Sequence, residues 1–337
     1  TKSGLIDGAN RAIQDVKFIP EWGKERMEIM LKDRPDWCIS RQRDWGIPIP
    51  LFFESESGEL HPEQNEIFNK ASEAIKKTGI DSWKNLELGV DDKGFEKSKD
   101  IFDVWFDSGI THYCVMDERF GSNTQADLYL EGSDQHRGWF QSSLLTSIAM
   151  KGTSPFKSVL THGFVVDDSG RKMSKSIGNV VDPKDIIQNS GADILRFWIA
   201  STDFRGEMAF SKDIFDRSID GFRRIRNTMR FMVSNLYDFD HKFEEKNLLY
   251  LDRILLNKTK ELQEEIQKCY EEYNFHLIIS KILNFCVNDL GGLYLDVIKD
   301  RLYTMKPNSL GRKSAQYTLD KILNTLLKAI SPILSFT

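Results

Sequence analysis

The feature that most constrains the fold is a change of sequence pattern near residue 211. Beyond it, three or four long segments carry apolar residues at helical spacing and contain few Gly or Pro. These segments are 212–237, 249–273, 276–300 and 313–330. Long helices joined by short connections pack against their sequence neighbours in alternating directions. We therefore predict an all-α antiparallel helical bundle over residues 211–337.

Residues 1–210 follow a different pattern, that of an α/β domain. Residues 126–131 are predicted to form a strand that ends at Gly132, and a helix of about a dozen residues should follow it. Residues 157–166 are a second strand candidate, and a tight turn follows at 167–170. Strand, helix and strand in this order favour a parallel sheet of the doubly wound, Rossmann-like kind.

Two further segments of the α/β part stand out. Residues 20–34 predict a short helix that Pro20 leads into, with apolar residues at helical spacing. Residues from about 50 to 100 are polar and rich in Gly, Lys and Asp, with a helix expected near 62–77. We interpret this stretch as a small insertion with little core of its own.

The overall composition is that of an ordinary soluble protein. Of the 337 residues, 40% are hydrophobic and 29% are charged, and nothing resembles a signal peptide or a membrane span. We expect a cytoplasmic protein without a membrane partner. The net charge is −5, but residues 216–337 are net positive. This asymmetry is mild support for a nucleic-acid partner of the helical part, although many helical bundles share it.

The cysteine pattern argues against both zinc and disulfides. The four cysteines lie far apart and form no C-x-x-C pair: Cys38, Cys114, Cys269 and Cys286. Reduced, buried thiols are the default interpretation. Clustered carboxylates that could make a dedicated metal cage are also absent from the sequence.

A short loop carries the most specific chemical pattern. After the predicted turn, residues 171–176 are Arg-Lys-Met-Ser-Lys-Ser, and Gly170 and Gly178 flank them. A mobile loop of this kind can bring Lys172 and Lys175 over a polyphosphate, where they would stabilise charge on departing pyrophosphate. The alternative is a solvated basic loop. The five-residue pattern, placed after a strand and a turn, favours catalysis.

The end of the first predicted strand is the second candidate site. Ligands of parallel sheets bind beyond the carboxyl ends of the strands. Glu131 could hold an ammonium or hydroxyl group, Gly132 would let a nucleotide approach the backbone, and Asp134 and Gln135 could bind ribose hydroxyls. A plain helix start near His136, with Asp134 as its cap, is the simpler alternative, and the two can coexist.

These segments together resemble class I aminoacyl-tRNA synthetases, and the isoleucyl members in particular. The lysine loop at 172–176 matches the family's Lys-Met-Ser-Lys-Ser pattern, and Glu-Gly-Ser-Asp-Gln-His-Arg-Gly-Trp at 131–139 points to isoleucine. Similar stretches are found at 37–46, 103–109 and 160–164. The resemblance continues through 191–196 and 294–301, and so covers essentially the whole chain.

The resemblance implies a reaction and a set of partners. It implies ATP-dependent activation of L-isoleucine to isoleucyl-adenylate, with Mg²⁺ accompanying ATP, and transfer of the acyl group to tRNA(Ile). Residues 1–210 would then be part of the catalytic domain, and residues 211–337 part of a helical domain that binds the anticodon arm. A monomer is expected. Another aliphatic synthetase, or a tRNA-binding module without catalysis, remains a competing hypothesis.

The resemblance also assigns roles to single residues. Glu131, Gly132, Asp134 and Gln135 would contact the aminoacyl-adenylate. His162, Gly163 and Phe164 would border the adenine. Lys175 would stabilise the transition state of adenylate formation with help from Lys172. Trp105 and Trp139 would wall the amino-acid pocket, although core packing is the usual role of a lone Trp.

Three arginines and the two chain ends complete the expectations. Arg223, Arg226 and Arg230 share one helical face, where they could meet tRNA phosphates or form ion pairs within the protein. Both ends look like cuts inside a longer protein. The family's upstream histidine pattern and editing insertion should precede Thr1, and a zinc-binding segment should follow Thr337. We therefore expect the chain alone to be inactive.

Overall fold

The computed structural model describes residues 4–34, 36–86 and 94–337, and the chain divides into two compact units. The first unit comprises Thr1–His162 and the second Gly163–Thr337. The change of sequence pattern at about residue 211 therefore falls inside the second unit. Ile194 and Phe197, which precede it, pack in the same buried cluster as Ile225 and Ile282 of the helices. A domain boundary at residue 211 stays a prediction.

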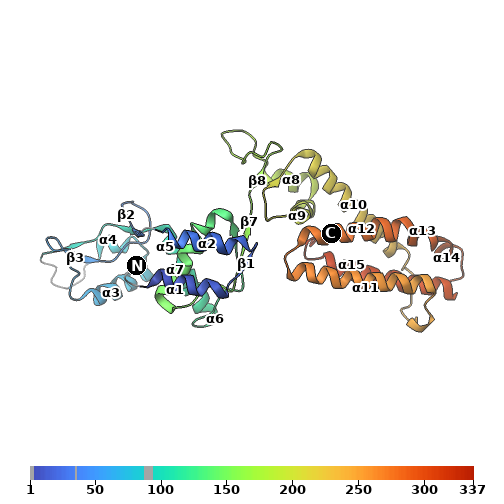
Figure 1. The fold of residues 1–337 in the computed structure, drawn as a ribbon, viewed down its shortest axis with the longest axis horizontal. Coiled ribbons are helices and arrows are strands. Elements are labelled where there is room, and N and C mark those ends of the chain that lie inside the picture. The colour runs from blue at the N-terminus through green and yellow to red at the C-terminus, as the bar shows by residue number, and fades with distance from the viewer. Residues whose placement is uncertain (1–3, 35, 87–93) are drawn as a thin grey trace. The chain divides into compact units, whose positions relative to one another are not determined.

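The first unit contains a three-stranded parallel sheet. Its strands are β1 (Lys17–Ile19), β6 (Tyr129–Gly132) and β7 (Ser158–His162), in the order β1-β7-β6. Strands β1 and β7 are labelled in Figure 1. Helix α7 (Trp139–Lys151) connects β6 to β7, as the strand–helix–strand pattern predicted. Strand β1 was not predicted, because three residues are too few to show an alternating pattern.

Helices α1 (Leu5–Ala12), α2 (Trp22–Lys32) and α7 supply apolar side chains to the core beside this sheet. Further helical segments of the first unit include α5 (Val104–Gly109) and α6 (Glu118–Phe120), with a π-helical segment over His112–Asp117 and 3₁₀ turns at Ile13–Asp15 and Ser133–His136. Helix α2 confirms the predicted helix at 20–34, and its Met27 and Leu31 are fully buried one turn apart. They pack with Phe140 and Leu144 of α7.

The polar stretch near residues 50–100 has a small hydrophobic cluster of its own. Strands β3 (Phe52–Glu54) and β4 (Phe95–Lys97) pair antiparallel beside α3 (Gln64–Thr78) and α4 (Ser82–Asn85). Trp83 is 3% exposed and packs with Phe52, Ile67 and Ala71. This cluster is small, and in it Trp83 of α4 meets side chains from β3 and α3. The short strands β2 (Ser40–Arg41) and β5 (Ile101–Phe102) form a further antiparallel pair.

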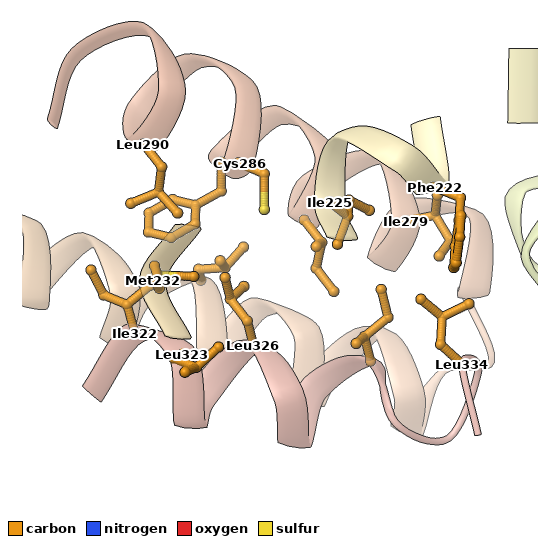
Figure 2. Close-up of a cluster of buried hydrophobic side chains, with 14 of the residues drawn as sticks. Phe222, Ile225, Met232, Ile279, Cys286, Leu290, Ile322, Leu323, Leu326 and Leu334 are labelled. Atoms are coloured by element: carbon orange, nitrogen blue, oxygen red, sulfur yellow. The ribbon is translucent and has the colours of Figure 1, made fainter. Parts of the chain in front are cut away.

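The second unit is mainly helical, as predicted. Its helices are α8 (Pro183–Ser190), α9 (Ala192–Ser201), α10 (Lys212–Ser234), α11 (Tyr250–Glu271), α12 (Phe275–Asn284), α13 (Leu295–Val297), α14 (Lys299–Tyr303) and α15 (Leu310–Ile330), with a 3₁₀ turn at Glu245–Asn247. Helices α11 and α15 lie side by side (Figure 1). Apolar side chains from α10, α12 and α15 meet in a continuous core, in which Ile225, Met232 and Leu326 are fully buried (Figure 2).

The predicted helix over 276–300 is interrupted. A π-helical segment, Phe285–Tyr294, separates α12 from α13, and α14 follows as a further short helix. Gly291 and Gly292 lie in this segment, and adjacent glycines weaken an ordinary α-helix. No helix in the described part of the chain is long and apolar enough to cross a membrane.

The predicted strand at 157–166 is in fact two strands. Strand β7 ends at His162, and β8 (Val165–Val166) then pairs with β9 (Met208–Ala209). At Gly163 the chain passes directly against another backbone: its N–H donates to the carbonyl of Phe204 over 2.8 Å. A Cβ at this position would lie 1.9 Å from the carbonyl oxygen of Gly206. Only glycine fits at this close approach, and residues 163 and 164 belong to neither strand.

The cysteines differ in part from expectation. All four are free thiols, but Cys38 and Cys114 are exposed, so the expectation of burial is wrong for these two. Cys269 and Cys286 are buried in the helical core. Burial raises the pKa of Cys286 to about 12.

Candidate active site

Two neighbouring strand ends in the first unit form one candidate site. Strands β6 and β7 are parallel, and their register pairs Gly132 with His162, so both carboxyl ends lie at the same edge of the sheet. Glu131 is exposed there, while Gly132 is buried. The structure therefore brings together Glu131, Gly132 and His162, three residues that the family resemblance assigns to adenylate binding.

The turn after β6 is built differently from the simple cap expected. Residues Ser133–His136 form a 3₁₀ turn, and α7 begins only at Trp139. The carboxamide oxygen of Gln135, rather than Asp134, accepts the hydrogen bond from the Trp139 N–H (2.9 Å). The expectation that Asp134 caps a helix at His136 is thus wrong, because the 3₁₀ turn carries Gln135 onto the helix start. Asp134 remains exposed.

Gly138 allows this arrangement, a role that the sequence did not reveal. A Cβ at residue 138 would lie 2.5 Å from the Gln135 side-chain oxygen and 3.2 Å from the Trp105 ring. Any other residue would displace one of these side chains. A glycine just before a helix was the available sequence signal, but only the tertiary contacts explain it.

The two candidate pocket tryptophans lie on α5 and α7, which pack against each other. The Trp139 indole stacks on Tyr129, with 4.0 Å between ring centroids, and its Nε1 donates to the Ser108 carbonyl (3.0 Å). Trp105 is 42% exposed, and its ring lies beside Gly138. Trp139 is therefore a packing residue, in addition to any role in a pocket. Trp105 has more exposed surface that a ligand could contact.

Two carboxylates next to Trp105 were not singled out from the sequence. Asp103 is 4% exposed, forms an ion pair with Arg41 and accepts a hydrogen bond from the Trp105 N–H (2.7 Å), which fixes the start of α5. Burial, followed by the nearby charge of Asp103, raises the pKa of Asp107 to about 6. These residues line a pocket of about 510 Å³ together with Arg43. A shifted carboxyl group in a pocket is typical of functional sites.

The lysine loop, which lies in the second unit, is a second candidate site. Asp167, at the end of β8, organises its first turn: the carboxylate accepts hydrogen bonds from the backbone of Ser169 (3.0 Å) and Arg171 (2.8 Å). The side-chain amide of Asn179, with these bonds, lowers the pKa of Asp167 to about 2. The carboxylate is therefore ionised at neutral pH, and its stabilising effect is lost only as the pH falls towards 2.

The two loop lysines are exposed, as a role in polyphosphate binding requires. The Lys172 ammonium lies over the ring of Phe164, 4.5 Å from its centroid. The structure therefore joins Lys172 to a residue expected to border the adenine. Gly170 and Gly178, on either side of the loop, both have positive φ (74° and 75°), a conformation that other residues rarely adopt.

The three arginines of α10 have different surroundings. Arg223 lies 3.6 Å from Asp220, and Arg226 lies over the Phe222 ring. Arg230 lines a pocket of about 550 Å³ at the end of the bundle, with the exposed rings of Tyr237 and Tyr303.

The described residues include no group of three or more His, Cys, Asp or Glu side chains arranged to hold a metal ion.

Comparison with known proteins identifies the family. The family described as "tRNA synthetases class I (I, L, M and V)" matches residues 2–211, which include both candidate sites. The chain belongs to this family. A second family, "Anticodon-binding domain of tRNA ligase", matches residues 252–337 of this class I synthetase chain.

Curated relatives of this synthetase chain are isoleucine–tRNA ligases. Those of Ruthia magnifica and Acinetobacter baylyi are 53% and 52% identical, over 100% and 99% of this chain. The chain spans 37% and 36% of their lengths. The sequence resemblance to isoleucyl-tRNA synthetases is thus confirmed.

Solved structures of class I synthetases share the fold. The Mycobacterium tuberculosis methionyl-tRNA synthetase in complex with methionyl-adenylate has a TM-score of 0.70 and 18% identity, covering 99% of this chain and 59% of that one. A LeuRS–tRNA–LeuAMS complex from Agrobacterium radiobacter has a TM-score of 0.65 and 19% identity, covering 90% of this chain and 40% of that one. The predicted parallel α/β domain followed by a helical bundle is confirmed.

Proposed function

We propose that this chain contributes to the ATP-dependent activation of L-isoleucine and its transfer to tRNA(Ile), as part of a longer protein. The lysine loop, held on an ordered base after β8, is the observation that carries this proposal. The identities of 53% and 52% to isoleucine–tRNA ligases support isoleucine as the amino acid. We infer a cytoplasmic, monomeric enzyme.

In the proposed reaction, the isoleucine carboxylate attacks the α-phosphorus of ATP and pyrophosphate leaves. The acyl group then passes from the adenylate to the terminal ribose of tRNA. Lys175, assisted by Lys172, stabilises the charge on the departing pyrophosphate, and Mg²⁺ enters with ATP as part of the substrate. Glu131 and Asp134 bind the adenylate at the strand ends, with Gln135 beside them. His162, Gly163 and Phe164 border its adenine.

Isoleucine-dependent exchange of pyrophosphate into ATP tests this function. The full-length protein should catalyse exchange with isoleucine much faster than with valine, leucine or methionine. A preference for one of the other three would assign a different synthetase. If the protein bound tRNA but catalysed no exchange with any amino acid, it would instead be a binding module. The 337-residue chain alone is expected to give no exchange, because it spans only 37% of the relatives' length.

The amino-acid pocket gives a sharper prediction at Trp105. Trp105→Ala should raise the KM for isoleucine about tenfold or more, with a smaller change in the KM for ATP, because a lost apolar wall removes contacts with the substrate side chain. Trp22→Ala is a matched control, since Trp22 is 40% exposed and lies on α2. A larger rise in the KM for ATP than for isoleucine would place Trp105 on the nucleotide side.

We also propose that the helical bundle binds tRNA through the pocket that Arg230 lines. Its contents suit an unstacked nucleotide: a cation for phosphate, the amide of Asn227, and the exposed rings of Tyr237 and Tyr303 for stacking. Arg312 is 8% exposed at the same pocket, and its Nε is buried without a hydrogen-bond partner among the described residues. Such a donor favours a polar ligand there.

Arg230→Ala should weaken tRNA binding about fivefold and reduce the salt dependence by roughly one phosphate contact. Titrations of the full-length protein with tRNA(Ile) at several salt concentrations measure both effects. Arg224→Ala, which removes the same charge from an exposed position on the same helix, should have a clearly smaller effect. Equal losses of tRNA affinity for the two variants would mean that tRNA binding depends on net charge and not on the pocket.

A further inference from the structure

The segment that carries the lysine loop lacks regular structure of its own. Residues 173–178 lie in neither a helix nor a strand, and both loop lysines are exposed. A loop of this kind samples many conformations unless its ends are held, and ordering it costs conformational entropy. The side chains that close its base therefore determine how often the lysines occupy a productive position.

Asn179 closes this base from the carboxyl side of the loop. Its Oδ1 accepts a hydrogen bond from the backbone N–H of Ser174 (2.9 Å), at the middle of the lysine motif. Its Nδ2 donates to Asp167 Oδ2 (3.0 Å) and more weakly to the carbonyl of Lys172 (3.4 Å). One amide therefore contacts the loop, its first lysine and the turn before it.

Asp167 is the fixed side of this contact. It is 8% exposed, and both of its oxygens are engaged: Oδ1 by two backbone N–H groups, Oδ2 by Arg171 Nε (2.9 Å) and by Asn179. Because the carboxylate can only accept hydrogen bonds, it orients the Asn179 amide with the Nδ2 group inward and Oδ1 towards Ser174. Hydrogen bonds to a charged group are about twice as strong as neutral ones.

We propose that Asp167 and Asn179 are positioning residues of the lysine loop, which hold the Ser174 backbone and so set the direction from which Lys172 and Lys175 reach the polyphosphate. This inference rests on the proposed function for its kinetic consequences. Neither residue touches the substrate in this role. The pair acts on adenylate formation, the step in which pyrophosphate departs, and leaves the transfer of a preformed adenylate to tRNA unchanged.

The kinetic test uses Asn179→Ala in the full-length protein. Adenylate formation should slow about tenfold, with little change in the KM for isoleucine, because the contact orders catalytic groups and not the amino-acid pocket. In a Lys172→Ala, Lys175→Ala background the same substitution should change the rate by less than about twofold, since the groups it positions are absent. Asp168→Asn, an exposed carboxyl group on the same turn, is the matched control with no effect.

An exchange of the two residues separates the specific contact from general stability. Asn179→Asp should be at least as damaging as Asn179→Ala, because it places two carboxylates against each other. Asp167→Asn combined with Asn179→Asp restores one carboxylate and one amide and should recover part of the loss, because Arg171 Nε then loses its Oδ2 acceptor. Full activity of Asn179→Ala, or an undiminished tenfold loss in the background without the lysines, would overturn the inference.

A measurement independent of activity keeps this inference distinct from the proposed function. Trypsin cleaves after Arg171, Lys172 and Lys175, and cleavage requires the loop to open. Asn179→Ala should raise the cleavage rate at these sites at least about fivefold relative to Asp168→Asn. If Asn179→Ala raised the cleavage rate but the protein catalysed no pyrophosphate exchange, the contact between Asp167 and Asn179 would be supported and the proposed function would not. An unchanged cleavage rate would show that Asp167 and Asn179 do not hold the loop, whatever the activity of the variant.

Discussion

Replacing Lys175 by alanine in the full-length protein should slow adenylate formation about a hundredfold. Lys175 is exposed and follows Ser174, whose backbone N–H is held by Asn179, so its charge can be directed at a polyphosphate at little further cost. The benefit is greatest when pyrophosphate leaves and its negative charge builds up. The loss of one such electrostatic contact is worth roughly 3 kcal/mol, which corresponds to about two orders of magnitude in rate.

The loss at Lys175 should appear in the rate of the chemical step and not in isoleucine binding. Single-turnover formation of isoleucyl-adenylate at saturating isoleucine measures it directly. Lys184→Ala is the matched control, because Lys184 is an exposed lysine at the start of the next helix, α8. A rate for Lys175→Ala within about twofold of wild type would exclude the assigned role.

Replacing Asp252 by alanine should destabilise the helical bundle more than any exposed substitution. Asp252 has no exposed surface, and its carboxylate accepts hydrogen bonds from Tyr294 (2.7 Å), Arg301 (3.1 Å) and Ser314. It thereby joins α11 to the π-helical segment, α14 and α15. Removal of the carboxylate leaves the Arg301 guanidinium largely buried without its counter-charge, which costs about 3–5 kcal/mol.

Two comparisons test this explanation for Asp252. Asp289→Ala removes the ion-pair partner of Lys258 on the same bundle; this pair is more exposed than Asp252 and Arg301, so the loss should be less than about 1 kcal/mol. Asp252→Ala with Arg301→Met should regain part of the lost stability, because no buried charge remains unpaired. Hydrogen exchange of the α11 and α15 amides in the full-length protein reports bundle opening. If the Asp252 and Asp289 variants exchanged equally fast, the buried network would not stabilise the bundle.

The sequence was informative wherever a pattern is local. Apolar residues at helical spacing located α10, α11 and α15, because each helix buries one face and the spacing records that face. The lysine motif predicted an exposed loop because two cations beside small polar residues have little to bury. Strands β6 and β7 were also found from a local pattern, because each is longer than three residues.

Only the tertiary structure decided the features that depend on residues far apart in the chain. The break at Gly163 results from the passage of residues 204–206, about forty positions later, against its backbone. The hydrogen bonds of Asp252 join residues 42 to 62 positions apart. The hydrogen bond at the base of the lysine loop joins Asp167 to Asn179. Sequence periodicity indicates which face of a segment is buried. It does not indicate which distant polar group that face contacts. The sequence by itself therefore located the long helices, strands β6 and β7 and the exposed lysine loop. The chain path at Gly163 and the buried polar contacts follow from the folded arrangement, where a buried polar group must find its partner.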